Sequence, residues 1–223
     1  MKGVPAGFIH RYLDPSESLL EILFGLIMAL TLTAGARLIP ERDEVDAAGL
    51  ALALVGCNVA WGIIDAVFYL LGTRFNRNRR VQLVRRLRAT TDEEEALDAI
   101  REEFGLEGEP SMLEEDRTAF YRSMLQMLQH AGIARARFLR DDFVAAFLIV
   151  LLVTATAVPG ALPLLLLDDA HKALRVANIL QIGLLFVMGY GWAHYSGANP
   201  WRTGVLIALL GVGLVLVSVA LGG

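Results

Sequence analysis

The sequence is poor in the residues on which several classes of protein depend. Its 223 residues include one cysteine, Cys57, which excludes a disulfide framework and a cluster of thiolate metal ligands. It has no glycine-rich phosphate loop, histidine-rich zinc motif or nucleophile triad, so nothing in it predicts an enzyme. The net charge is only −4, which argues against a nucleic-acid-binding protein. The 55% of hydrophobic residues exceeds the roughly 45–50% of soluble domains and indicates a membrane protein.

Charge is absent from long stretches of the chain. The three uncharged stretches are residues 143–167, 176–201 and 203–223. Each has the roughly 20 residues that a helix needs to cross a hydrocarbon core. Residues 47–73 form a fourth apolar stretch, with Asp65 inside it, and residues 18–39 form another, uncharged between Glu21 and Arg37. The sequence therefore predicts an all-α polytopic membrane protein with five transmembrane helices.

A densely charged segment separates the second apolar stretch from the third. Residues 73–141 hold 13 basic and 13 acidic side chains. Arginines crowd both ends of this segment: Arg74, Arg77, Arg79, Arg80, Arg85, Arg86 and Arg88 at the first, and Arg135, Arg137 and Arg140 at the second. The positive-inside rule places the segment in the cytoplasm. The N-terminus is then cytoplasmic and the C-terminus lies outside.

This pattern divides the chain into three parts. Residues 1–73 contain a helix that starts at the membrane surface and transmembrane helices 1 and 2. Residues 74–141 form a charged cytoplasmic insert, and residues 142–223 contain transmembrane helices 3 to 5. We expect the insert to be a small helical domain.

Capping signals predict three helices in the insert. The first covers residues 78–89. A capping box that begins at Thr91 opens the second, which Gly105 ends. A further capping box that begins at Ser111 opens the third, which continues to about His130.

The end of the second span carries a basic group that can bind an anionic partner. Its members are Arg79, Arg80, Arg85 and Arg86. Binding of nucleic acid is one interpretation. Contact with anionic lipid headgroups is favoured, because the group adjoins a transmembrane helix.

Two further groups in the insert are candidate metal ligands. Glu95, Asp98 and Glu102 have the i, i+3, i+7 spacing that puts carboxylates on one helix face, as a hard divalent cation requires. A solvated acidic face is the commoner explanation of this spacing. Met124 and Met127 offer thioether sulfur to a soft metal, although core filling is the default role of methionine.

Asp65 is the most informative residue in the sequence. An ionisable group within a span is energetically costly, so it faces other helices or a water-filled path and has a partner. The functional interpretation is reversible protonation or exchange of a proton for a cation; the structural one is a hydrogen bond to Thr31, Thr33 or a backbone carbonyl of a neighbouring helix. If the first two spans are adjacent and antiparallel, Glu21 falls beside Asp65 and the two form one site. Asn58 lies two turns from Asp65 on nearly the same face.

Two features predict how the spans pack. Gly25, Ala29 and Thr33 are spaced by four and form a stripe of small residues that allows another helix to approach closely. The first span can use it against the second span, or against its own copy in a dimer. Pro159 and Pro163 predict that the third span is kinked or ends early.

Three stretches of the sequence, together with the order of the spans, carry a family resemblance. They are EILFGLIMALT at residues 21–31, GCNVAWG at residues 56–62, and GYG through SG to WR between residues 189 and 202. With two spans, a charged insert and three more spans, the chain resembles the vacuolar iron transporter family. The resemblance implies a homodimer in the bacterial inner membrane that exchanges protons for Fe²⁺ or Mn²⁺ along a path between the two first spans. It also implies that the insert collects metal on glutamates and methionines.

The chain departs from this family's pattern in two places: its insert does not reproduce the family's regularly spaced glutamates cleanly, and its first span differs at one key position. Where transporters of the family carry an Asp-Gly pair in the first span, this sequence has Met28 and Ala29. We therefore expect the path to use Asp65, Glu21, Met28 and Asn58, with Asp65 in place of the missing carboxylate and Met28 as a soft ligand. No covalently bound cofactor is expected. The alternative hypothesis is a non-transporting dimeric membrane module that binds a partner or anionic lipid through its cytoplasmic helices.

Overall fold

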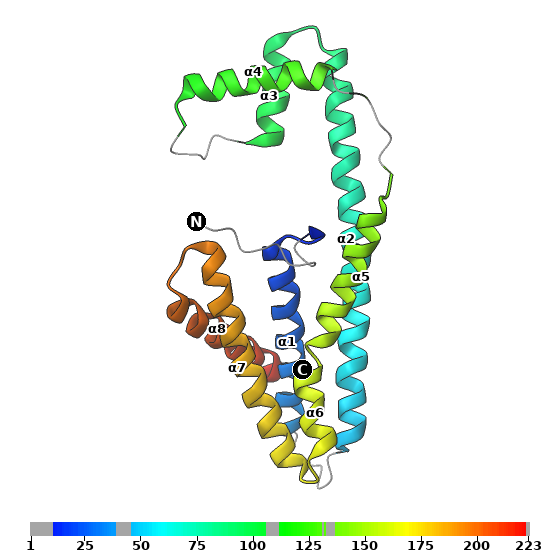
Figure 1. Ribbon diagram of the computed structural model, residues 1–223, viewed down its shortest axis with the longest axis vertical. Helices are drawn as coiled ribbons and strands as arrows, with labels where there is room; N and C mark the ends of the chain where they lie inside the picture. The colour runs from blue at the N-terminus through cyan, green and yellow to red at the C-terminus, as the bar shows by residue number, and fades with distance from the viewer. Residues whose placement is uncertain (1–10, 39–45, 106–111, 131, 133–136, 222–223) are drawn as a thin grey trace. The chain divides into compact units, whose positions relative to one another are not determined.

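The computed structural model describes residues 11–38, 46–105, 112–130, 132 and 137–221. Within these ranges it is all-helical, without a β-strand (Figure 1). The helices are α1 (Pro15–Leu38), α2 (Ala47–Ala89), α3 (Glu93–Phe104), α4 (Glu114–His130), α5 (Arg140–Ala155), α6 (Val158–Leu166), α7 (Ala170–Ser196) and α8 (Pro200–Ala220). The predicted all-α class is confirmed. The predicted capping residue Ser111 and the basic residue Arg135 lie outside the described residues.

Five helical segments are long and apolar enough to cross a membrane. They are Pro15–Ala36, Ala47–Ala89, Arg140–Leu166, Ala170–Ser196 and Pro200–Val217. These segments agree with the five predicted spans. The chain is a multi-pass membrane protein.

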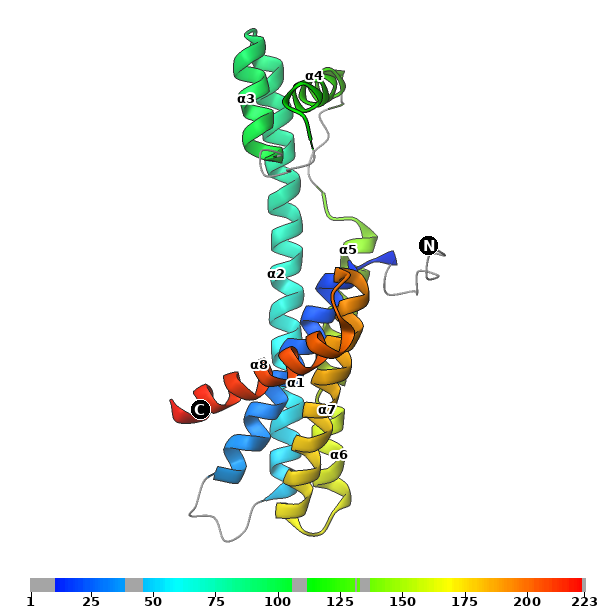
Figure 2. The same ribbon diagram turned by 90° about the vertical axis from the view of Figure 1, so that its left-hand side faces the viewer.

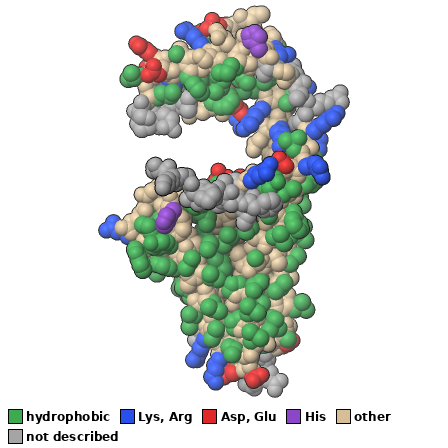
Figure 3. Space-filling view, in the orientation of Figure 1, with side chains coloured by type: hydrophobic (Ala, Val, Ile, Leu, Met, Phe, Trp, Pro, Cys, Tyr) green, Lys and Arg blue, Asp and Glu red, His purple; other side chains and the backbone are tan. Residues whose placement is uncertain are grey.

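The chain forms two compact units. Met1–Tyr69 and Arg140–Gly223 make up the membrane unit, and Leu70–Leu139 make up the insert unit. Hydrophobic side chains cover most of the visible face of the membrane unit, and charged side chains gather at its two ends (Figure 3). This distribution suits a body surrounded by lipid, whose tails accept apolar side chains and not charged ones.

Helix α7 begins at Ala170, six residues before the uncharged stretch 176–201 that indicated this span. Asp169 sets this start, because its side chain accepts hydrogen bonds from the backbone N–H groups of His171 and Lys172 at 3.0 and 3.1 Å. These hydrogen bonds, above all that from Lys172, hold the pKa of Asp169 below its ordinary value. The helix ends at Gly197, whose φ of 70° is in the left-handed region that favours glycine. Local capping, and not the last charge, therefore begins the helix.

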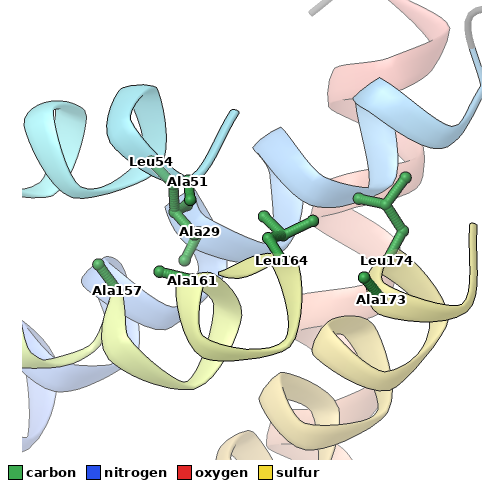
Figure 4. Close-up of a cluster of buried hydrophobic side chains, with 8 residues drawn as sticks. All are labelled: Ala29, Ala51, Leu54, Ala157, Ala161, Leu164, Ala173 and Leu174. Atoms are coloured by element: carbon green, nitrogen blue, oxygen red, sulfur yellow. The ribbon is translucent and has the colours of Figure 1, made fainter. Parts of the chain in front are cut away.

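The core of the membrane unit includes two clusters of small and branched side chains, which together involve five helices. One buried cluster joins α1, α2 and α7 to α6 and the residue before it (Figure 4). Its members are Ala29, Ala51, Leu54, Ala157, Ala161, Leu164, Ala173 and Leu174. A second cluster joins α1, α7 and α8, and α8 crosses α1 and α7 obliquely (Figure 2). The many alanines allow close helix approach, as expected where lipid supplies no hydrophobic drive for packing.

The third span is broken, as its prolines predicted. Helix α5 ends at Ala155, and α6 begins at Val158 with Pro159 in its first turn and Pro163 inside it. Proline lacks the N–H of a regular helix and its ring clashes with the preceding turn. The break brings non-helical backbone into the interior of the membrane unit.

The insert unit packs the end of α2 against α3 and α4. Its buried core includes Leu87, Leu97, Ile100, Tyr121 and Leu125. The helix predicted at residues 78–89 is the continuation of α2, which runs without a break for 43 residues. Helix α3 ends at Gly105 as predicted. Its N-cap is Asp92 and not Thr91: the Asp92 carboxylate accepts the N–H of Glu94 at 3.0 Å.

Replacing Leu97 by alanine should destabilise the insert unit by about 2–5 kcal/mol, because the change leaves a cavity in its core. Leu97 is only 1% exposed. Leu113, at 72% exposed, provides the matched control, and Leu113→Ala should change the stability little. Hydrogen exchange of the α3 and α4 amides measures the local stability. Equal exchange rates in the two variants would contradict the assigned core.

Candidate functional site

Two acidic side chains from different membrane-spanning helices meet in the membrane unit. Glu21 of α1 and Asp65 of α2 lie within hydrogen-bonding reach of each other. Both residues are half-buried. Glu21 Oε2 and Asp65 Oδ2 are buried, and no donor reaches either oxygen within the described structure. The proximity expected from antiparallel first and second spans is present, and Glu21 takes the place that Thr31 or Thr33 was expected to fill.

The contact between Glu21 and Asp65 limits the protonation states of the pair. Two carboxylates offer only acceptor oxygens, so a hydrogen bond between them requires a proton that they share. When both are deprotonated, the pair carries two negative charges and unpaired oxygens, which are the ligands that hard divalent cations prefer. The pair can therefore hold either a proton or a cation.

Asn58 joins three helices next to this pair. Its side chain is fully buried, and its Nδ2 lies 3.3 Å from the Gly25 carbonyl, 3.1 Å from the Val153 carbonyl and 2.9 Å from the Thr156 hydroxyl. An amide has two N–H hydrogens, which it shares among these three acceptors. Asn58 Oδ1 is buried without a partner in the described structure. The predicted path residue thus ties α1 and α2 to the break that follows α5.

Gly25 allows this close approach. A Cβ atom at Gly25 would lie 2.2 Å from Thr156 Oγ1 and 3.2 Å from the Val153 carbonyl oxygen. Gly62 approaches the same part of α5, because its Cβ would lie 3.1 Å from Val150 Cα. The close packing of α1 and α2 against α5 around Asn58 therefore depends on glycine, which has no side chain, at both positions.

Met28 lies one turn after Gly25 and contacts the one cysteine. The Cys57 thiol lies 3.7 Å from the Met28 sulfur, where it can donate a weak hydrogen bond. Met28 is half-buried and Cys57 is exposed. Sequence reasoning missed this contact, since only the packing of α1 on α2 reveals it.

The stripe of small residues packs inside its own chain. Ala29 and Thr33 are fully buried, and the Thr33 hydroxyl lies 3.0 Å from Oε1 of the buried Gln181 on α7. Gly25 is covered by Thr156, as described above. The prediction that Gly25, Ala29 and Thr33 form a dimer interface was therefore wrong, because these residues have no surface left for a second copy.

The acidic side chains of α3 do not assemble into a metal site. Glu95, Asp98 and Glu102 are exposed. Asp98 pairs with Arg101 at 2.8 Å, and Glu102 lies 4.0 Å from Arg86. No group of three or more His, Cys, Asp or Glu residues in the described part of the chain is placed to hold a metal ion. The helical spacing was right, but neighbouring arginines neutralise two of the three carboxylates.

The methionines of α4 have separate positions. Met124 packs against the core of the insert unit, whereas Met127 is 67% exposed. The side chains predicted to collect metal are thus divided between a packing role and the surface.

Half of the predicted lipid-binding group takes part in ion pairs within the insert unit. Arg79 pairs with Glu103 at 2.6 Å, and Arg86 lies near Glu102. Arg80 and Arg85 are exposed. Two of the four arginines therefore stay directed to solvent or to a partner.

Comparison with models of known protein families shows which family the chain belongs to. A family model described as the VIT family matches residues 25–223. This range includes Met28, Asn58 and Asp65, the whole insert unit and the last three spans. Among curated proteins, no match was found. Because the match covers nearly the entire sequence, the chain belongs to the vacuolar iron transporter (VIT) family.

Proposed function

We propose that this protein moves a divalent metal ion, Fe²⁺ or Mn²⁺, across the bacterial inner membrane in exchange for protons. The observation that carries the proposal is the contact between the carboxyl groups of Glu21 and Asp65 on two membrane-spanning helices. Membership of the VIT family supports a transporter-like role. Intramembrane acidic residues generally mark ion pathways and proton relays.

The pair supplies the two states that exchange requires. In one state Glu21 and Asp65 share a proton, and in the other both are deprotonated and face the metal ion. With the shared proton the pair carries one negative charge, and with a bound divalent cation it carries none, so neither state leaves two uncompensated negative charges inside the membrane, where charge is costly. Asn58 Oδ1 and the Met28 sulfur are the next available ligands, an oxygen and a soft sulfur.

We also propose that the protein is a homodimer, in which the exposed face of α1 meets the second copy. Leu20 and Phe24 are 39% and 52% exposed, and the half-buried Met28 continues their line. This face is exposed, whereas the stripe is buried. A second copy packed on it would lie close to Met28. It replaces the stripe as our proposed interface. The N-terminus is proposed to be cytoplasmic, from the arginines at both ends of the insert.

Purified protein in liposomes tests the proposal. With an imposed pH gradient, Mn²⁺ should enter the vesicles faster than in protein-free liposomes, and its entry should move protons in the opposite direction. Collapsing the gradient with a protonophore should stop net uptake. Absence of both fluxes would overturn the proposal, and binding of the same preparation to anionic vesicles would then favour the non-transporting module.

A further inference from the structure

A cavity on the membrane unit lies apart from the acidic pair. It has a volume of about 530 Å³, within the range of small-molecule sites. Three helices line it with apolar side chains: Leu30 and Ala34 of α1, Ile179 and Ile182 of α7, and Val212 and Val215 of α8. All three helices are membrane spans, so the apolar part of the cavity lies at the depth of lipid tails.

One end of this cavity carries a positive charge. Arg175 lines the cavity in the second turn of α7, near the end of the span, and its side chain is exposed. Among the described residues it has no acidic partner. Lys172, one turn earlier, is paired with Asp169 at 3.1 Å. An unpaired guanidinium at this position disfavours a metal cation and suits a phosphate, which it can bind through two parallel hydrogen bonds.

A polar acceptor lies one turn deeper in the same cavity. Asn178 lines it, and its Oδ1 is buried without a hydrogen-bond partner in the described structure. An unpaired amide oxygen is unfavourable unless a donor reaches it. The hydroxyl or amine groups of a lipid headgroup are donors of this kind.

We propose that this cavity binds one anionic phospholipid, with its phosphate on Arg175 and an acyl chain between α1, α7 and α8. Charge and depth together carry the inference. A soluble anion would bind the arginine but would leave the apolar part of the cavity empty, whereas a lipid fills both. A guanidinium binds a phosphate through charge-assisted hydrogen bonds, and the apolar lining accepts an acyl chain.

Native mass spectrometry of the full chain in detergent tests the proposal. Wild-type protein should retain one phosphatidylglycerol per chain in preference to phosphatidylcholine. Arg175→Gln should weaken this binding about fivefold, the effect of one basic residue near an anionic lipid surface. Lys172→Gln removes the same charge from the same helix end and is the matched control, because Lys172 is already paired. Equal lipid binding by wild type and Arg175→Gln would overturn the proposal.

A second variant distinguishes lipid from other occupants. Ile179 is 70% exposed, so Ile179→Trp should be tolerated by the fold while it fills the cavity. The expected result is loss of bound phosphatidylglycerol with an unchanged oligomeric state. A changed monomer–dimer equilibrium without lipid loss would instead assign the cavity to a second copy. Competition by inorganic phosphate alone, at the same affinity, would assign it to a free anion and also overturn the proposal.

Discussion

Replacing Asp65 by asparagine should reduce proton-driven Mn²⁺ uptake to the level of protein-free liposomes. The asparagine keeps the size of the side chain but can neither release a proton to Glu21 nor supply a negative charge to the metal. The loss should exceed the roughly 10–100-fold that follows removal of an outer-shell partner of a metal site. Glu21→Gln should have the same effect, since either change leaves one carboxyl where the exchange needs two.

Glu17→Gln provides the matched control for this prediction. Glu17 lies one turn before Glu21 on α1 and is exposed. Its replacement should leave the uptake nearly unchanged. Normal uptake by Asp65→Asn would show that the pair is structural, and a thermal unfolding curve of each variant would separate loss of transport from loss of folding.

Replacing Gly25 by alanine should destabilise the membrane unit by about 1–3 kcal/mol, the usual cost of overpacking a close-packed interior. The new Cβ would lie 2.2 Å from Thr156 Oγ1 and 3.2 Å from a backbone carbonyl of α5, so either the Thr156 side chain or α5 must move. The hydroxyl that clashes is also an acceptor for Asn58. Thermal unfolding in detergent measures the change.

Gly56 on α2 is the control for Gly25. Nothing lies within 4 Å of a Cβ at Gly56, so Gly56→Ala should be neutral or slightly stabilising, as expected for alanine in a helix. Combining Gly25→Ala with Thr156→Ala should cost less than the sum of the single changes, because the second removes the clashing oxygen. Strict additivity would show that Thr156 is not the obstacle.

Much of the helical framework could be predicted from local signals. Apolar stretches marked the five spans, three of them entirely free of charge, since charges are excluded from hydrocarbon. Pro159 and Pro163 marked the break in the third span, and Gly105 marked the end of α3. Helix α7 extends beyond its uncharged stretch, because Asp169, which caps the helix, lies before that stretch.

The candidate site could be predicted only in part. Asp65 was identified because a charged residue within a span is exceptional, whichever face of the helix carries it. The roles of Ala29 and Thr33 could not be assigned, because the same small-residue spacing serves packing within a chain and between two chains. The stripe is buried by α5, α6 and α7, and sequence spacing on α1 contains no information about which helix covers it.

The sequence by itself determined an all-helical membrane protein with an unusual carboxyl group in its second span. Only the tertiary structure decided that Glu21 is the partner of Asp65, that Asn58 holds the break after α5, and that Arg175, which has no acidic partner among the described residues, lines an apolar cavity. The physical reason is the range of the forces involved. The cost of burying a charge and the capping of a helix depend on each residue and its near neighbours, whereas the meeting of two side chains depends on how each helix is rotated and packed.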